Sequence, residues 1–220
     1  MILRSRKIPW RCRVSVVVPC AARHASLLPG LIAALERQTS RPDEVVISIS
    51  GVAASPKMSS RTFPLLCAST SGPANAARNR NVGSARASGD VLLYQDADDL
   101  PHPQRVEIIR TIFGRLEIDH LMHGFVYENS LSGGFTRRHD VNNLHDRVRG
   151  RRAYAFELGL TNGNPAVSKK LATAVRWPEE RSVGEDVAFN QAACARSGRS
   201  GVLSVPLLLY RHRLSAGRGP

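Results

Sequence analysis

The sequence predicts an α/β protein in which a mostly parallel, Rossmann-like sheet is flanked by helices. Apolar, β-branched runs at Val14–Val18 and Glu44–Ser50 are typical of buried strands, and an amphipathic helical stretch lies between them. Strand, helix and strand in this order form a right-handed βαβ unit, which builds a parallel sheet covered by helices. A chain of 220 residues has the ordinary size of one domain, so we expect one domain over residues 1–220.

The remaining elements are predicted from apolar spacing and flanking residues. The first helix is expected to start at Ser26 as its cap, with Pro29 tolerated in its first turn. The later elements expected are a strand over Phe63–Cys67, a helix over Pro73–Arg86 capped near Gly89, a strand over Val91–Gln95, a helix around Val106–Ile112, a strand over Leu121–Tyr127, a hairpin turn at Ser132-Gly133-Gly134, a helix over Val183–Ala195 and a strand over Val202–Tyr210.

The segment Asn142–Arg152 is polar and basic. We expect a surface loop there, and its basic part at 145–152 is a candidate mobile loop.

Composition narrows the class of protein without identifying it. The chain has 31 Lys and Arg against 18 Asp and Glu, a formal charge of +13 that favours anionic partners of any kind. No apolar stretch is long enough to span a bilayer, and the apolar run after the basic start is too short for a signal peptide. Four scattered cysteines suit a reducing compartment. We therefore expect a cytoplasmic protein. Its basic face is compatible with contact to a membrane surface or to an anionic polymer, and both alternatives stay open.

Acidic residues follow the strand predicted at Val91–Gln95. Asp96 and Asp98 lie one residue apart at the carboxyl edge of the sheet, where ligands of open α/β sheets bind. Two such carboxylates can face a hard divalent cation, which stabilises the charge that grows on a departing diphosphate. An isolated Asp-x-Asp is more often a turn or a helix cap, so its context decides.

That context resembles the glycosyltransferases of family 2. The resemblance is carried by Gly72-Pro73-Ala74-Asn75-Ala76-Ala77-Arg78-Asn79, then Val82-Gly83, then Ala87-Ser88-Gly89-Asp90 continuing to Asp99. Val14–Pro19 is similar to the family's first strand, Gly184-Glu185-Asp186 to its Glu-Asp motif at the head of a helix, and Tyr210-Arg211-His212 to its late basic segment. The resemblance spans roughly residues 13–215.

The resemblance implies an A-type glycosyltransferase (GT-A) fold and inversion at the anomeric carbon. It implies a nucleotide-sugar-binding half at about 13–100 and an acceptor-binding, catalytic half at about 101–215. The substrates implied are a nucleotide-sugar, a UDP-sugar first, and a carbohydrate or lipid-linked acceptor, with Mn²⁺ or Mg²⁺. The residues implied are Asp186 as base with Glu185 beside it; Pro19, Ser50, Arg78, Asn79, Asp96, Ala97, Asp98 and Arg211 for the donor; and Asp96, Asp98 and His212 for the metal.

One departure from the family concerns the end of the second strand. Ser50 stands where relatives carry an acidic residue that hydrogen-bonds the nucleotide base, which puts uridine specificity in doubt. A binding module with weak or no turnover therefore stays open.

Two further alternatives concern other classes of protein. A nucleotidyltransferase would need a glycine-rich phosphate loop after the first strand, and Pro19–His24 contains no glycine. Nucleic-acid binding would explain the charge but not the acidic run, so it is not favoured.

Overall fold

The computed structural model describes residues 3–7, 10–53, 56–70, 72–128, 135 and 138–211. Within them, one sheet has the strand order β3-β2-β1-β4-β8-β6-β9-β5, and β7 pairs with β9 off this path. The strands are β1 (Val14–Ala21), β2 (Glu44–Ser50), β3 (Leu65–Thr70), β4 (Val91–Tyr94), β5 (Leu100–Pro101), β6 (His120–Tyr127), β7 (Arg149–Arg151), β8 (Ala166–Ser168) and β9 (Ser200–Tyr210). The helices are α1 (Leu28–Glu36), α2 (Ala76–Arg86), α3 (Arg105–Arg115), α4 (Lys169–Ala174) and α5 (Glu185–Ser197), with short 3₁₀ helices at η1 (Ala22–Leu27) and η3 (Leu144–Arg147).

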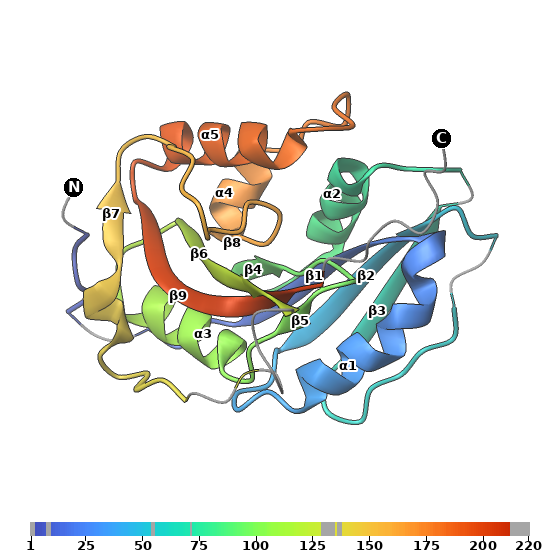
Figure 1. Cartoon of the computed structure of the whole chain (residues 1–220), viewed down its shortest axis with the longest axis horizontal. Helices are drawn as coiled ribbons and strands as arrows, with labels where there is room; N and C mark the ends of the chain where they lie inside the picture. The colour runs from blue at the N-terminus through green and yellow to red at the C-terminus, as the bar shows by residue number, and fades with distance from the viewer. Residues whose placement is uncertain are drawn as a thin grey trace.

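The sheet is mostly parallel, as predicted. The long strands β1, β2, β3, β4, β6 and β9 run in one direction, and the short strands β5, β7 and β8 run against them. Helices α1 and α3 cover one face of this sheet and α2, α4 and α5 cover the other (Figure 1). The α/β class predicted from the sequence is therefore confirmed.

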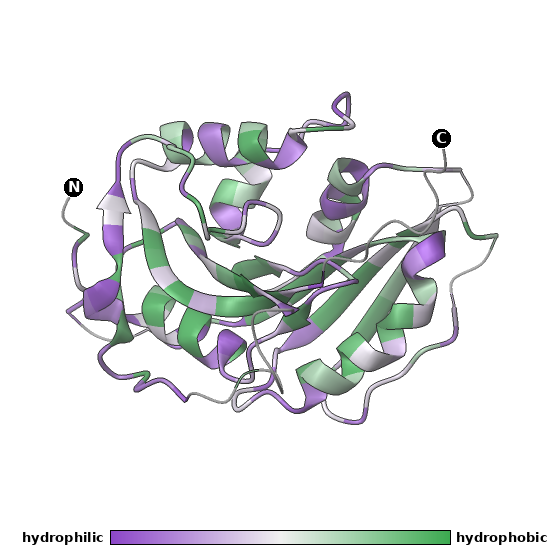
Figure 2. Cartoon of the chain, in the orientation of Figure 1, coloured by the Kyte–Doolittle hydropathy of each residue, from purple (hydrophilic) through white to green (hydrophobic). Residues whose placement is uncertain are grey.

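Side-chain alternation along the strands divides the core between the two faces. Val14, Val16 and Val18 of β1 pack into the cluster that contains α1 and α3. Val17 packs on the opposite side, with residues of α2, α4 and α5. Apolar residues consequently fill the strands at the centre of the molecule (Figure 2). No helix of the described residues has the length and apolar content needed to cross a bilayer.

Three predicted boundaries are corrected. Ser26 does not cap α1: η1 leads directly into the helix, and Ala25 accepts a backbone hydrogen bond from Leu28. Helix α2 begins at Ala76 rather than Pro73, because the side chain of Asn75 accepts the Arg78 N–H at 2.9 Å.

Gly89 is not a helix cap either. Helix α2 ends at Arg86, and the Gly89 N–H donates to Ser15 Oγ. A Cβ at Gly89 would lie 2.5 Å from that oxygen, so the glycine allows close packing against β1.

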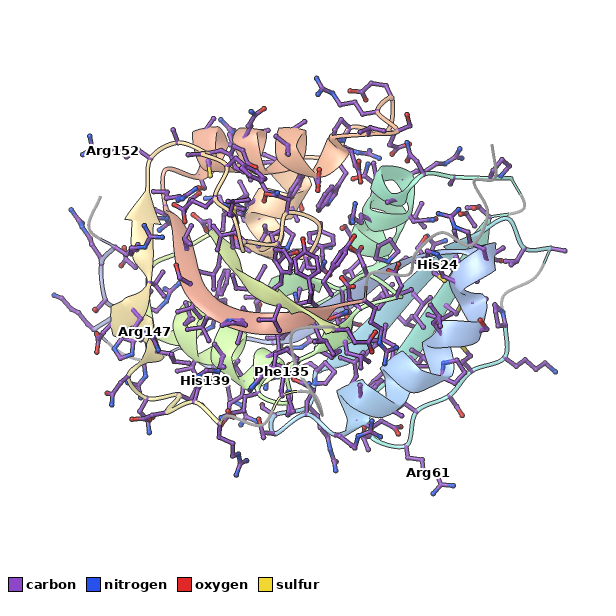
Figure 3. The ribbon with its side chains drawn as sticks, viewed as in Figure 1. His24, Arg61, Phe135, His139, Arg147 and Arg152 are labelled. Carbon is purple, nitrogen blue, oxygen red and sulfur yellow. The ribbon has the colours of Figure 1, made fainter. Side chains whose placement is uncertain are left out.

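The segment Asn142–Arg152 is only partly a loop, which corrects the prediction. It contains η3, whose Leu144 is buried, and β7, which pairs antiparallel with β9. Leu144 and Val148 pack against the core, and the edge of β9 offers backbone groups to β7, so packing and pairing together fix this segment. Figure 3 shows Arg147 and Arg152 at the outer side of the molecule, with Arg152 pointing away from it. The predicted hairpin turn at Ser132-Gly133-Gly134 lies outside the described residues.

Candidate active site

Two cavities meet at the carboxyl end of β4. Cavity A has a volume of about 390 Å³, and its lining includes the end of β1, the start of α2 and the turn after β4. Cavity B has a volume of about 500 Å³, and its lining includes residues of β6, the segment 156–164, the start of α5 and the end of β9. Arg80, Asp96 and Glu185 line both cavities, so these three side chains form the junction between them.

Arg80 holds this junction together. It lies on α2 with a side chain that is only 3% exposed, and its Nη2 donates to Asp96 Oδ1 at 2.8 Å. Its Nη1 donates to Glu185 Oε1 at 3.2 Å, while its Cζ lies 4.3 Å from the ring centroid of Trp177. Burial opposes the charge, but the two carboxylates outweigh burial and raise the pKa of Arg80 above its ordinary value. The guanidinium therefore fixes a carboxylate from the turn after β4 against one from α5.

The three aspartates after β4 have different environments. Asp96 is held on both oxygens, by Arg80 and by Asn164 Nδ2 at 3.0 Å. Asp98 lines cavity A with a side chain that is 34% exposed, and its Oδ2 lies 4.0 Å from His24 Nδ1. Asp99 is buried, and burial together with the charges of Asp96 and Asp98 raises its pKa to about 8. Asp98 is therefore the carboxylate best placed to meet a ligand in cavity A.

Arg105 supports the acidic turn at 96–99 through hydrogen bonds to backbone carbonyl groups beside it. The side chain is fully buried, and it donates hydrogen bonds to the carbonyl oxygens of Tyr94 and Asn164 and to His123 Nε2. Burial lowers the pKa of Arg105 to about 9. The guanidinium ties the end of β4 to the loop that carries Asn164, so both are held in one position.

The start of α5 brings Glu185 and Asp186 to the junction. Gly184 has φ 72°, a left-handed conformation that favours glycine, and the helix begins directly after it. Asp186 lines cavity B, and its Oδ1 accepts the N–H of Val187 at 2.8 Å. The first turn of the helix favours negative charge here. Glu185 is committed to Arg80, whereas Asp186 faces the second cavity.

Gly163 permits the segment 156–164, which lines cavity B, to approach the junction closely. A Cβ at this position would lie 2.8 Å from Asp96 Oδ2 and 3.0 Å from Arg80 Nη2. The next residue, Asn164, accepts the Asp96 N–H at 2.7 Å. A side chain on Gly163 would therefore press on the Arg80–Asp96 pair.

Most residues predicted for the site come together in the structure. Pro19, Asn79, Asp96, Ala97, Asp98 and Glu185 line cavity A, and Asp186 lines cavity B.

The structure places three other predicted donor residues outside both linings. Ser50 is buried beneath cavity A, where its hydroxyl donates to the Ala74 carbonyl and accepts from Asn79 Nδ2. Arg78 is exposed, because its position on α2 faces solvent. The side chain of Arg211 pairs with Glu128, while its backbone N–H donates to Asp99 Oδ1 at 3.3 Å. His212 lies outside the described residues.

Sequence reasoning missed Arg80 and Asn164. The chain repeats an Arg-Asn pair at Arg78-Asn79 and Arg80-Asn81, and we assigned the first pair to the family's motif. Helical phase distinguishes the two pairs. Residues three and four positions apart share one face of a helix, so Arg80 and Asn81 lie on the same buried face of α2 as Ala77. Nothing in the local pattern of Thr161–Asn164 marked Asn164, which reaches the site only through the fold.

Comparison with known proteins decides the family. The sequence profile described as "Glycosyl transferase family 2" matches residues 15–172. The chain belongs to glycosyl transferase family 2. A relative from Haemophilus influenzae, described as an uncharacterized glycosyltransferase, is 32% identical over 128 residues, which are 56% of this chain and 42% of the relative.

Solved structures share the fold of this family 2 chain. S. aureus TarS 1-349 in complex with UDP-GlcNAc superimposes with a TM-score of 0.69 at 17% identity, over 91% of this chain and 59% of TarS 1-349. The mannosyltransferase PcManGT from Pyrobaculum calidifontis, in complex with GDP-Man and Mn²⁺, gives a TM-score of 0.54 at 17% identity, over 91% of this chain and 57% of that protein. The chain spans less than two thirds of each of these three proteins. The similarity confirms the expected GT-A fold.

Proposed function

We propose that this chain transfers a sugar from a nucleotide-diphosphate donor in cavity A to an acceptor hydroxyl in cavity B, with inversion at the anomeric carbon. The acceptor oxygen forms the new bond to the anomeric carbon as the bond to the diphosphate breaks. Asp186 takes the proton of the hydroxyl, which is the work of a general base. In this proposal residues of about 13–100 contribute most of the donor site and those of about 101–215 most of the acceptor site.

The junction of the two cavities carries the proposal. Arg80 joins Asp96, on the donor side, to Glu185, which is followed directly by the proposed base. A reaction between two bound substrates needs their reacting groups held close together, and the shared lining brings the two cavities to one point. Glycosyltransferase relatives that bind UDP-GlcNAc or GDP-Man support a nucleotide-sugar as the donor.

The residues of cavity A fit a divalent cation held jointly with a diphosphate. Within the described residues, no group of three or more His, Cys, Asp or Glu side chains is placed to hold a metal ion. Asp98 would hold the cation with Asp96 beside it, and Mg²⁺ commonly binds through one or two carboxylates plus substrate phosphates. The bound ion supplies positive charge that offsets repulsion between these aspartates and the diphosphate.

Calorimetry tests the donor site and its metal separately. UDP and GDP are titrated into the wild type with Mn²⁺ and with EDTA, and into Asp98→Asn with Mn²⁺. Asp146→Asn is the matched control, because its side chain is 73% exposed and lies outside both cavities. We expect metal-dependent binding that Asp98→Asn weakens at least about tenfold and Asp146→Asn does not. Equal affinity of the wild type for a nucleotide in EDTA and in Mn²⁺ would contradict the metal assignment. If neither UDP nor GDP bound at all, the proposed donor site would be refuted.

A further inference from the structure

Aromatic side chains are concentrated in the lining of cavity B. Of the chain's six Phe, four Tyr and two Trp residues, Phe125, Tyr127, Phe156 and Tyr210 line this cavity. Tyr127, Phe156 and Tyr210 are 47%, 65% and 41% exposed, although large aromatic side chains are usually buried. An exposed aromatic cluster in a cavity that is also lined by carboxylates and amides indicates a ligand with an apolar surface of its own.

Strand register holds three of these rings together. Phe125 and Tyr127 lie two residues apart on β6, so they point to the same face, and Tyr127 is the direct partner of Tyr210 on β9. The Phe125–Tyr127 and Tyr127–Tyr210 centroid distances are 5.2 and 5.7 Å, both with edge-to-face geometry. Two packed strands therefore carry the rings, which gives a rigid wall rather than a loop that adapts to its ligand.

The charge of cavity B disfavours an anionic ligand. Its lining includes the carboxylates of Asp96, Glu157, Glu185 and Asp186, and Arg80 is the single cation among the lining residues that the structure describes. Arg80 is already paired with two of these carboxylates. Glu157 is paired with Arg149 and Arg151. A uronate or phosphate group entering the cavity would meet more negative charge than positive charge.

Hydrogen-bonding groups lie in the same cavity as the rings. Asn162 contributes an amide to its lining and Asp186 a carboxylate. Thr161 and Asn164 are already hydrogen-bonded to each other, and Asn164 is also bonded to Asp96. An alkyl chain would displace water from the carboxylate of Asp186 without replacing its hydrogen bonds, which is costly. A sugar ring presents C–H groups on its face and hydroxyls around its edge, so it matches both parts of the lining.

We propose that cavity B binds an uncharged pyranose of the acceptor, with the face of the sugar ring on the wall formed by Phe125, Tyr127 and Tyr210. This inference rests on the proposed function, because it names the acceptor class for the same site. The basic surface of the protein then does not select the sugar that accepts the transfer. An anionic polymer could be substrate only through a neutral sugar unit.

Saturation-transfer NMR on the full chain tests this assignment, with UDP and Mg²⁺ present. The probes are the methyl β-glycosides of glucose, galactose and N-acetylglucosamine, with methyl β-glucuronide as the charged counterpart of the glucoside. We expect saturation of ring C–H protons in at least one neutral glycoside and none in the glucuronide. Tyr127→Ala should weaken the binding about tenfold, whereas Tyr127→Phe, which keeps the ring, should not.

Control variants and competitors separate the alternatives. Trp10→Ala removes another exposed aromatic residue, outside cavity B, and should leave the signal unchanged. Binding of the glucuronide at least as strong as that of the glucoside, or an unchanged signal in Tyr127→Ala, would overturn the inference. So would displacement of the glycoside by hexanol, which would assign the wall to a lipid chain. If UDP binds with Mg²⁺ but none of the neutral glycosides does, the inference fails while the donor site stands.

Discussion

Arg80 donates a 2.8 Å hydrogen bond to Asp96 from a side chain that is 3% exposed. A second hydrogen bond from the same guanidinium reaches Glu185, on a different element. Arginine presents several N–H groups in a planar fork, so one side chain can orient two carboxylates at once. The position of the acidic turn therefore depends on a helix residue that need not contact either substrate.

Arg80→Lys should impair both donor binding and turnover. A lysine keeps the charge but has no fork, so it can hold one of the two carboxylates and leaves the other less fixed. We expect at least about a tenfold loss in kcat/KM for the donor. Steady-state kinetics measures it, with circular dichroism to confirm folding. Arg78→Lys, at the exposed neighbour, is the matched control, and equal kinetics in both variants would show that the fork is dispensable.

Gly163→Ala should disturb the site through sterics alone. The new Cβ would lie 2.8 Å from Asp96 Oδ2, so the carboxylate or the loop must shift. Displacements of about 1 Å can cost on the order of a hundredfold in rate. Gly30→Ala, in α1, adds the same methyl group where nothing lies within 4 Å, and should leave the rate unchanged. Full activity in Gly163→Ala would show that the loop relaxes without cost to the site.

Ser50 predicts weak discrimination among nucleotide bases. Its hydroxyl is committed to Ala74 and Asn79, and a serine has no carboxylate with which to hold a nucleotide base. We expect the dissociation constants of UDP, GDP, CDP and ADP to lie within about tenfold, or about 1.4 kcal/mol. Ser50→Ala should leave their ratios unchanged while it lowers the free energy of unfolding by about 1 kcal/mol. A hundredfold preference of the wild type for UDP would contradict this account.

His123 makes stability depend on pH below neutrality. Burial, with the nearby charge of Arg105, lowers the pKa of His123 to about 3, so the folded protein keeps the ring neutral. The unfolded chain takes up the proton near pH 6.5, and stability is therefore complete above that pH and falls as pH drops from 6.5 towards 3.

His123→Gln, which retains an acceptor for Arg105, should remove this contribution. Below pH 6 the free energy of unfolding should fall more steeply with decreasing pH in the wild type than in His123→Gln. The two slopes should differ by about 1.4 kcal/mol per pH unit. Urea titrations between pH 5 and 7 make the comparison, and parallel pH profiles of the two proteins would contradict a neutral, buried His123.

Much of the fold could be predicted because the central strands are continuous apolar runs. The predicted strand over Glu44–Ser50 has the observed bounds, and β1, β6 and β9 differ from their predicted bounds by a few residues. The strands β5, β7 and β8 contain two or three residues each, too few for a period to be recognised. Their pairing with longer strands creates them, and that pairing is not a local property of the sequence.

The candidate site was predictable where it follows a motif in the chain. Asp96, Asp98, Glu185 and Asp186 were named from such motifs, and their catalytic roles stay predictions. Arg80 was missed because the first of two successive Arg-Asn pairs was matched to the motif, and the helical phase that places Arg80 on the buried face of α2 was not applied. Asn164 joins the site through contacts with a residue 68 positions away in the chain, which no local pattern records.

The central claim is that Asp186 accepts the proton of the acceptor hydroxyl. The most direct test compares Asp186→Asn with the wild type by donor titration and by single-turnover sugar transfer, with Asp146→Asn as the control. We predict an unchanged dissociation constant for the nucleotide and a loss of about a hundred- to ten-thousandfold in the rate of transfer. Transfer at the normal rate by an Asp186→Asn protein of lowered thermal stability would contradict the account, because Asp186 would then only cap α5.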